Sequence, residues 1–362
     1  MRSVNGLERA AKLDYQDSGY KGDRTYQYEN GDLTLVDARG TSQSENIKVE
    51  GLIENGVGNV YVDSEGEVSF TIYNDEWCAT KSFIDKTITV EVKTDSNCNL
   101  PKTFAQIMTG NSEVMDNDPD HNVRYVGADP DNYVWFNKEL WRIIGLFDGQ
   151  AKIIRSEYYS EDIDYPVWRD THSNDWATVP LKSEFNDGND SFLGNIQSMD
   201  PVSYSYIDLK HVWNIGGTAN FQTTTRSQFY AAERSNEISY YMTSHLWTGA
   251  IALMYPSDYG YSTSATNVEC DTTVMFSWDG TGNVKNCRNN SWLYGGEQSQ
   301  WFLTRLTNSY FAYYMGGKNL GFVAGTEGSG TDVGVKPTLY LKARVGIIDG
   351  TGTSGDPYKL SI

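Results

Sequence analysis

Residues 292–340 alternate two kinds of residue, and this pattern restricts the fold of the chain more than any other feature. Structural signals, Trp292, Trp301, Gly321 and Gly334–Pro337, suit packed strands and tight turns. Between them stand Tyr, Phe, Arg, Ser, Asn and Gly, a mixture typical of recognition surfaces, because rigid aromatics lose few rotamers and small polar residues adapt. The segment contains no catalytic constellation, so it indicates binding rather than chemistry.

The overall composition favours β-rich domains and excludes some partners. A chain of 362 residues is expected to form two domains. Its 25 Tyr, 10 Trp and 34 Gly suit strands, wet interfaces and many tight turns. The net charge of −19 repels phosphate backbones and gives no attraction to anionic lipid, so we expect no nucleic-acid partner. The chain has no apolar run of ~18 residues, the length that spans a bilayer, and it does not open with a signal peptide.

The first domain, residues 1–102, is predicted to be a helix followed by a small antiparallel sheet. Residues 4–16 carry Leu7, Ala10, Ala11 and Tyr15 at helical spacing. Alternating apolar residues over 33–72 indicate strands, and two of these form a hairpin whose turn is at 63–66. A further strand is expected over 87–92.

Residues 103–131 are predicted to be a linker because they are rich in Asp, Asn, Gly and Pro. The run Asp116–Asp120 has the acidic spacing of a calcium loop, but it lacks the Gly at position six and the distal Glu of an EF-hand. The alternative is a solvated acidic turn. Calcium is the only cofactor that the sequence suggests, and we expect no other cofactor.

The second domain, residues 132–362, is predicted to be an α+β domain with many loops, where binding usually resides. Strands are expected over 133–137, 140–148, 151–157, 336–345 and 358–362, and helices over 181–192 and 223–234. The fold class of the whole chain is therefore α+β.

The four cysteines form two couples that are close in sequence: Cys78 with Cys98, and Cys270 with Cys287. Closing such loops in an oxidising compartment would stabilise each by about 3 kcal/mol. None lies in a CxxC arrangement, which argues against zinc and redox sites. We predict two disulfides, and the alternative is four buried free thiols.

The N-terminal part resembles the globular portion of Gram-positive (Firmicutes) type IV pilins and pseudopilins. The residues that carry the resemblance are GLERAAKLDY and the hairpin GNVYVDSEGEVSFTIYNDEWCATKSF. Such proteins begin with a prepilin signal and a long apolar helix that inserts in the membrane and then packs in the pilus core. The resemblance implies an extracellular pilus on the cell surface, and contacts with membrane and other pilin subunits through that helix.

The C-terminal part is similar to pilin-attached domains with a C-type-lectin or formylglycine-generating-enzyme-like fold. The matching motifs cover 132–359 and include NYVWFNKELWRIIGLFDG, TGAIALMYPSDYGY, NNSWLYGGEQSQWFLT and GVKPTLYLKARVGIIDG. In some members a diversity-generating retroelement varies the segment that corresponds to 290–335. The related enzymes use reactive cysteines, but Cys270 and Cys287 look paired and no GxSxG or HExxH occurs, so we do not expect an enzyme.

The candidate ligand contacts are the aromatic, charged and apolar residues between the framework positions. They are Tyr294, Glu297, Phe302, Arg305, Tyr310, Tyr313, Tyr314, Lys318, Leu320, Phe322 and Glu327. The alternative is that about half of these side chains are core, whereas Trp292, Trp301, Ala312 and Val323 are expected to face inward.

Two further groups of residues could in principle form a metal site and a sugar-binding platform. His121, His172, His211 and His245 share no metal-ligand spacing, so no metal site is expected from them. Trp168, His172, Asp175 and Trp176 would suit a sugar platform, with a loop packed on the core as the alternative.

The expected function is a surface-displayed pilin adhesin or receptor. Its partner would be a protein or glycan on another cell, a phage or a host surface, and its binding face a retroelement-diversified variable segment. The alternatives are a structural pilus subunit and a calcium-dependent glycan-binding module.

Overall fold

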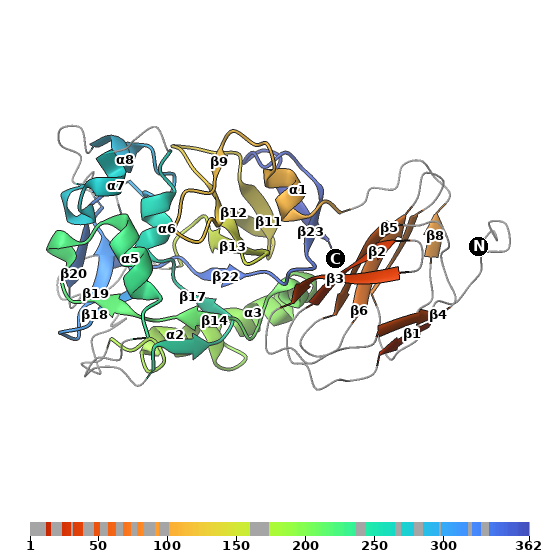
Figure 1. Ribbon diagram of the computed structural model, residues 1–362. Coiled ribbons are helices and arrows are strands. Elements are labelled where there is room, and N and C mark those ends of the chain that lie inside the picture. The colour runs from red at the N-terminus through yellow and green to blue at the C-terminus, as the bar shows by residue number, and fades with distance from the viewer. Residues whose placement is uncertain are drawn as a thin grey trace. The chain divides into compact units, whose positions relative to one another are not determined.

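The chain forms two compact units in a computed structural model (Figure 1). One unit combines residues 1–103, 342–348 and 360–362, and the other combines 104–341 and 349–359. The structure describes residues 12–15, 24–29, 32–38, 47–50, 57–62, 68–73, 78–82, 91–93, 101–159, 174–236, 244–264, 269–278, 285–296, 298–317, 321–326 and 333–361, and up to residue 93 it describes the backbone only. Helices and several sheets occur together, so the α+β class is confirmed.

The described part of the first unit is built on an antiparallel sheet in the order β3-β2-β5-β6-β7-β8. Its strands are β2 (Arg24–Glu29), β3 (Asp32–Ala38), β5 (Val57–Val62), β6 (Val68–Tyr73), β7 (Cys78–Ser82) and β8 (Glu91–Lys93). The predicted hairpin is confirmed, since β5 and β6 pair antiparallel with Val60 opposite Phe70. Of the strand expected over 87–92, the structure describes only the end that falls in β8.

The helix predicted over 4–16 is wrong where the structure describes it. Residues Lys12–Tyr15 form strand β1, which pairs antiparallel with β4 (Ile47–Glu50), and Leu13 lies opposite Val49. Both tetrapeptides alternate polar and apolar residues, and cross-strand pairs outweigh the local helical spacing. Residues 4–11 lie outside the described residues.

The described strands of the second unit form two larger sheets and one two-stranded sheet. The central sheet runs β17-β22-β13-β12-β11-β24, with β10 on β12 and β9 on β10. Its strands are β9 (Val114–Met115), β10 (Val123–Tyr125), β11 (Tyr133–Phe136), β12 (Glu139–Phe147), β13 (Gln150–Arg155), β17 (Ile251–Ala252), β22 (Thr338–Tyr340) and β24 (Tyr358–Ser361). The two-stranded sheet pairs β14 (Val212–Asn214) with β16 (Leu246–Thr248). Most of the short strand β23 (Gly346–Asp349) belongs to the first unit, where Ile347 bridges to Lys102.

The other sheet of the second unit runs β15-β18-β19-β20, with β21 on β18. Its strands are β15 (Gly217–Thr218), β18 (Ser299–Leu306), β19 (Ala312–Met315), β20 (Val323–Thr326) and β21 (Val333–Gly334). About half of the described residues in the predicted binding segment lie in these strands, so its described part is built on a sheet.

Two tight turns set the register of the central sheet. Asn137 and Lys138 both have positive φ, 54° and 60°, between β11 and β12. Asp148 and Gly149 repeat the pattern between β12 and β13, with φ of 48° and 76°. Positive φ at both central residues defines the type I′ hairpin turn, for which Asn-x and Asp-Gly are favoured. The three predicted strands over 133–157 are therefore confirmed.

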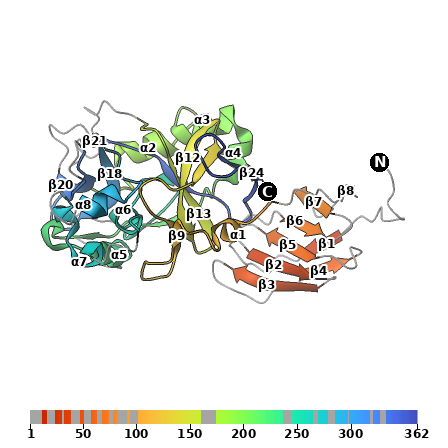
Figure 2. The ribbon, with the colours of Figure 1, turned by 90° about the horizontal axis from the view of Figure 1, so that it is seen from above.

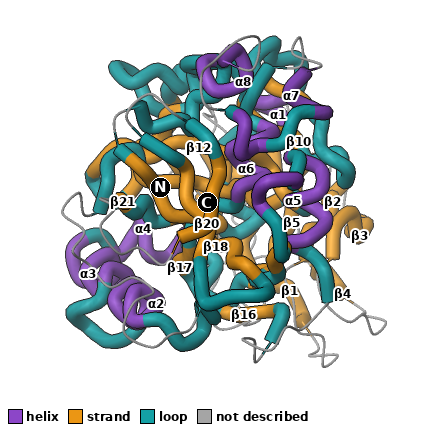
Figure 3. The backbone as a smooth tube through the Cα atoms, turned by 90° about the vertical axis from the view of Figure 1, so that its left-hand side faces the viewer, coloured by secondary structure: helices purple, strands orange, loops and turns teal. Residues whose placement is uncertain are grey.

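The helices form two groups on either side of the strands (Figures 2 and 3). One group is α2 (Pro180–Asn186), α3 (Phe192–Met199) and α4 (Pro201–Tyr206), and the other is α5 (Arg226–Glu233), α6 (Pro256–Tyr261), α7 (Glu269–Thr272) and α8 (Lys285–Asn289), with short 3-10 turns η1 (Phe221–Thr223) and η2 (Met275–Ser277). Helix α5 matches the predicted helix, and Thr225 and Gln228 form its capping box.

Two expectations about this unit differ from the structure. The helix expected over 181–192 is α2 followed by a new helix, because Gly188 has φ of 88° and the Ser191 side chain caps α3 by accepting from Gly194 N. The segment expected as a linker contains α1 (Phe104–Met108), β9 and β10 and belongs to the second unit. Buried side chains, among them Phe104 and Arg124, hold it there.

Candidate functional site

Three of the predicted contacts lie inside the second unit, which corrects their assignment to the surface. Phe302 and Tyr313 have no exposed surface and Arg305 is 1% exposed. The Tyr313 hydroxyl donates to Thr218 O at 3.3 Å, and its ring meets the Phe229 ring of α5 edge-on. Helix α5 therefore covers this side of β19, and a ligand outside the unit cannot reach these side chains.

Arg305 is a buried cation whose bonds go to backbone oxygens. Its Nη2 donates to Ile215 O at 2.7 Å and to Ser244 O at 3.2 Å. Burial lowers the pKa of Arg305 to about 10, and the charge of Asp175 raises it in part. Arg305 thus ties strand β18 to neighbouring segments instead of facing a ligand.

The framework residues point inward, as predicted. Trp292, Trp301, Ala312 and Val323 are all buried. The Trp292 indole Nε1 donates to Tyr125 O at 3.0 Å and so ties the start of the segment to β10.

Four predicted contacts remain partly exposed: Tyr294, Tyr310, Tyr314 and Phe322. Tyr314 and Phe322 touch, with ring centroids 5.9 Å apart. The Arg288 guanidinium lies 5.2 Å from the centre of the Tyr294 ring, and the Tyr310 ring packs on Phe311. The other four predicted contacts, Glu297, Lys318, Leu320 and Glu327, lie outside the described residues.

The Tyr314–Phe322 pair continues into rings from outside the predicted segment. Phe322 lies 6.0 Å from Phe276 of η2, which lies 5.3 Å from Phe221 of η1. Phe276 is 37% exposed, and the other three rings are half-buried. We call Phe221, Phe276, Phe322 and Tyr314 the aromatic row. Phe221 and Phe276 were not predicted from the sequence, because they lie in short 3-10 turns outside 290–335.

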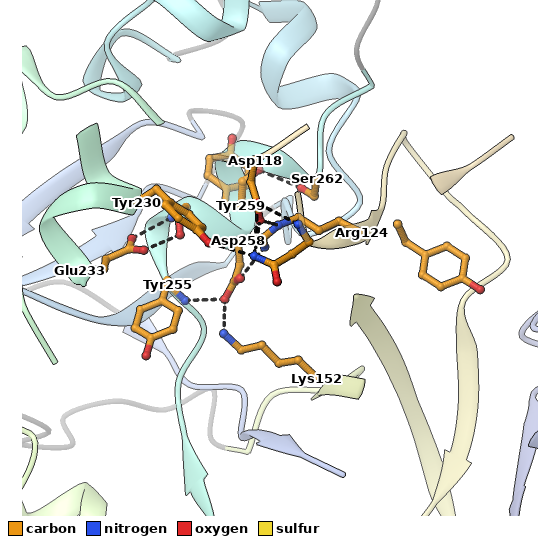
Figure 4. Close-up of polar contacts among 12 residues, drawn as sticks. Asp118, Arg124, Lys152, Tyr230, Glu233, Tyr255, Asp258, Tyr259 and Ser262 are labelled. Carbon is orange, nitrogen blue, oxygen red and sulfur yellow. Dashed lines mark hydrogen bonds and ion pairs between the residues drawn. The ribbon is translucent and has the colours of Figure 1, made fainter. Parts of the chain in front are cut away.

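A buried cluster of charges forms a second notable arrangement in this unit (Figure 4). Lys152 Nζ lies 2.5 Å from Asp258 Oδ2, and Arg124 Nη1 lies 2.7 Å from Asp258 Oδ1. Arg124 Nε also pairs with Asp118 at 2.8 Å. These four side chains have at most 1% exposed surface. Burial alone would raise the pKa of Asp258, but Lys152 and Arg124 lower it to about 2.

Aromatic rings surround the Lys152 ammonium. It lies 4.2 Å from the ring centre of Tyr255 and 5.4 to 5.5 Å from those of Phe147, Trp213 and Tyr340. Burial lowers the pKa of Lys152 to about 8, although the charge of Asp258 opposes this. At neutral pH both members of the pair are charged, and the rings add cation–π attraction. The arrangement suits an interior strut that joins β13 to α6.

Glu233 of α5 is a further buried carboxyl beside this cluster. It accepts from the backbone N of Ser257 at 3.0 Å and from the Ser257 hydroxyl, and Arg234 Nη1 lies 3.1 Å away. Burial raises the pKa of Glu233 to about 7, because it outweighs the attraction to Arg234 and the bonds from Ser257. A signal for this cluster was present in the sequence, since Lys152 interrupts an otherwise apolar strand, Ala151 to Ile154.

In the predicted calcium loop, both carboxylate oxygens of Asp118 accept hydrogen bonds from the protein. Asp118 Oδ1 accepts from the backbone N of Asp120 and of Asn122, each at 3.0 Å, while Oδ2 takes Arg124. A guanidinium at the oxygen that would bind a cation disfavours calcium at this residue. Among the described residues, no group of three or more His, Cys, Asp or Glu side chains could hold a metal ion.

The remaining predictions concern the disulfides, the sugar platform and the histidines. The Cys270–Cys287 disulfide is confirmed, and it joins α7 to α8. Of the Cys78–Cys98 couple the structure describes only the backbone of Cys78, in β7, so this disulfide stays a prediction. Trp168 and His172, two residues of the sugar platform, lie outside the described residues. Asp175 and Trp176 are buried, and the Trp176 ring packs on Trp247. Of the histidines, His211 stacks on Tyr340 with centroids 3.6 Å apart, which is a packing role.

Comparisons with protein families, curated proteins and solved structures found no match to this chain. In the part of the chain that the structure describes, no helix has the length and apolar character needed to cross a membrane.

Proposed function

We propose that the second unit is a ligand-binding domain that recognises a protein or a glycan through the aromatic row. The observation that carries the proposal is the contact chain of partly exposed rings, Phe221 to Phe276 to Phe322 to Tyr314. Exposed aromatics that touch one another are typical of binding sites, because each ring supplies contact area with few torsions to freeze.

The buried side chains behind the row support this proposal. Tyr313 anchors β19 to Thr218 and Phe229, and Tyr314 on the same strand meets the ring of buried Trp301 at 6.0 Å. A face built on a packed sheet loses little entropy when a ligand binds, so moderate contacts can suffice.

The wider proposal is that the chain is a pilin-like adhesin or receptor displayed on an extracellular pilus. The pilin-like motifs of the N-terminal part support it, and so does the C-type-lectin-like series of motifs in the C-terminal part. The mixture of Tyr, Phe, Ser, Asn and Gly between Trp292 and Gly334 supports diversification by a retroelement. In this proposal the chain is not an enzyme, and its partner lies on another cell, a phage or a host surface.

The first experiment is a screen of the chain against arrayed glycans and displayed bacterial, phage and host surface proteins. For any ligand found, Tyr314→Ala with Phe322→Ala should weaken binding at least tenfold, about 1.4 kcal/mol. The matched control is Trp135→Ala, since Trp135 is 48% exposed on β11 and lies outside the row. Unchanged affinity in the double variant, or equal losses in both, would remove the row from the binding site.

Sequencing of the codons for 288–335 in a natural population tests the diversification. We expect substitutions at Tyr314, Tyr310 and Phe322 and constancy at Trp292 and Trp301. A uniform segment would favour a receptor of fixed specificity or a structural pilus subunit, and binding that a chelator abolishes would favour a calcium-dependent glycan module.

A further inference from the structure

A single tyrosine outside the predicted segment touches both of its ends. A Cβ added to Gly295 would lie 2.3 Å from the Tyr158 hydroxyl, and one added to Gly334 would lie 2.4 Å from Cδ1 of the same ring. The Tyr158 hydroxyl donates to Gln298 O at 3.3 Å. Residues 295 and 334 thus approach the same ring so closely that a side chain at either place would force the ring to move.

Backbone bonds around Tyr158 hold the C-terminal end of the segment to the end of β13. Tyr159 N donates to Val335 O at 2.8 Å, and Arg155 N donates to Pro337 O at 3.0 Å. Lys336 Nζ donates to Ser156 O at 2.7 Å and lies 4.5 Å from the centre of the Tyr158 ring. Residues 155–159 therefore form a fixed attachment point for the C-terminal end of the segment. The Tyr158 side chain reaches from there to the N-terminal end of the segment.

The central sheet holds residues 155–159 in place. Arg155 Nη1 donates to Tyr158 O at 2.9 Å, and the same guanidinium pairs with Glu139 of β12 at 2.7 Å. The ring position therefore depends on β12 and β13, which contribute nothing to the aromatic row.

We propose that Tyr158 is a positioning residue that clamps the two ends of segment 295–334 together, so that the residues between them can change while the ends stay in place. Closing a long segment costs entropy that grows with its length, and the contacts of the clamp, together with the pairing of β18 with β21, offset part of that cost for every sequence between the ends. Gly295 and Gly334 are then required by the clamp and not by the ligand. The relevance to recognition rests on the proposed function, whereas the clamp itself is measurable without any ligand.

The test is amide hydrogen exchange on the full chain in the absence of ligand. Tyr158→Ala should raise exchange about tenfold or more at both ends of the segment, near Gly295 and Gly334, while β12 keeps its protection. Tyr158→Phe keeps the ring and loses the hydroxyl that donates to Gln298 O, so it should restore most of the protection. The matched control is Tyr204→Ala, a half-buried tyrosine on α4, which should leave both ends unchanged.

A double-mutant cycle distinguishes the clamp from general stabilisation. Gly334→Ala should lower the unfolding midpoint of the wild-type chain, and should lower it less when Tyr158 is already Ala, because the colliding ring is gone. Gly316→Ala, whose added Cβ would meet Phe322 instead, should cost the same in both backgrounds. Additive effects for Gly334 and Tyr158, or faster exchange throughout the unit in Tyr158→Ala, would overturn the proposal. Failure to find a ligand would bear only on the proposed function.

Discussion

The ammonium of Lys152 and the carboxylate of Asp258 are 2.5 Å apart, and neither side chain has exposed surface. Lys152 belongs to β13 of the central sheet, and Asp258 occupies the third position of helix α6. The same carboxylate accepts from the backbone N of Tyr255 at 2.9 Å and caps the helix. One side chain thus joins sheet and helix and pairs with two buried cations, Lys152 and Arg124, of which Arg124 also pairs with Asp118.

Asp258→Asn is expected to destabilise the second unit strongly. The substitution leaves Lys152 buried without its counter-charge, and breaking a buried pair in this way costs about 3 to 5 kcal/mol. Chemical denaturation followed by tryptophan fluorescence measures it, because nine of the ten tryptophans lie in residues 104–341. Asp349→Asn, which removes the exposed pair with Lys359, is the control and should leave the midpoint unchanged. Equal stability of the two variants would contradict the role of Asp258.

Glu233 is expected to make stability depend on pH between about 4.5 and 7. Its folded pKa, about 7, lies above the ordinary 4.5, so the folded state binds the proton more tightly. This contribution is complete below pH 4.5 and is lost as the pH rises through 7, with a full size of roughly 3 kcal/mol. The stability difference between wild type and Glu233→Gln should therefore fall with rising pH in this window. A difference that stays constant from pH 4.5 to 7.5 would show that Glu233 keeps an ordinary pKa.

Reduction of the Cys270–Cys287 bond is expected to lower the stability of the second unit. The bond spans a sequence separation of 17 and links two short helices, α7 and α8. Loop closure of this size contributes about 3 kcal/mol. Denaturation of the Cys270→Ala, Cys287→Ala variant measures the loss, and alkylation of the native chain without reductant should modify neither cysteine. Full alkylation of both would refute the disulfide.

Two aromatic substitutions in the predicted segment are expected to lower the free energy of unfolding by very different amounts. Phe302→Ala opens a cavity in the interior and should cost about 3 to 5 kcal/mol. Tyr314→Ala removes a half-buried ring and should cost no more than about 1 to 2 kcal/mol. Denaturation midpoints of the two single variants decide this. A larger loss for Tyr314 than for Phe302 would reverse the assignment of core and surface.

The segment 292–340 illustrates what could be predicted from the sequence. Its framework residues indicated packed structure and the aromatics between them a recognition surface, and the inward direction of Trp292 and Trp301 was confirmed. Yet Tyr313 and Tyr314 are adjacent and chemically identical, and only the first is core. Tyr313 is buried because it lies on the side of β19 that helix α5 covers, whereas Tyr314 does not. Helix α5 lies some eighty residues earlier in the chain.

By itself the sequence determined the local structure wherever turn chemistry or alternation was strong: the Asp148-Gly149 turn, the β5–β6 hairpin, the capped helix α5 and the Cys270–Cys287 pair. Tertiary structure alone decided that residues 12–15 are a strand, that Asp258 is the counter-ion of Lys152, and that Phe276 adjoins Phe322. The physical reason is that side-chain alternation and turn torsions act between neighbours in the chain. Burial and charge pairing depend instead on which distant segments the fold brings into contact.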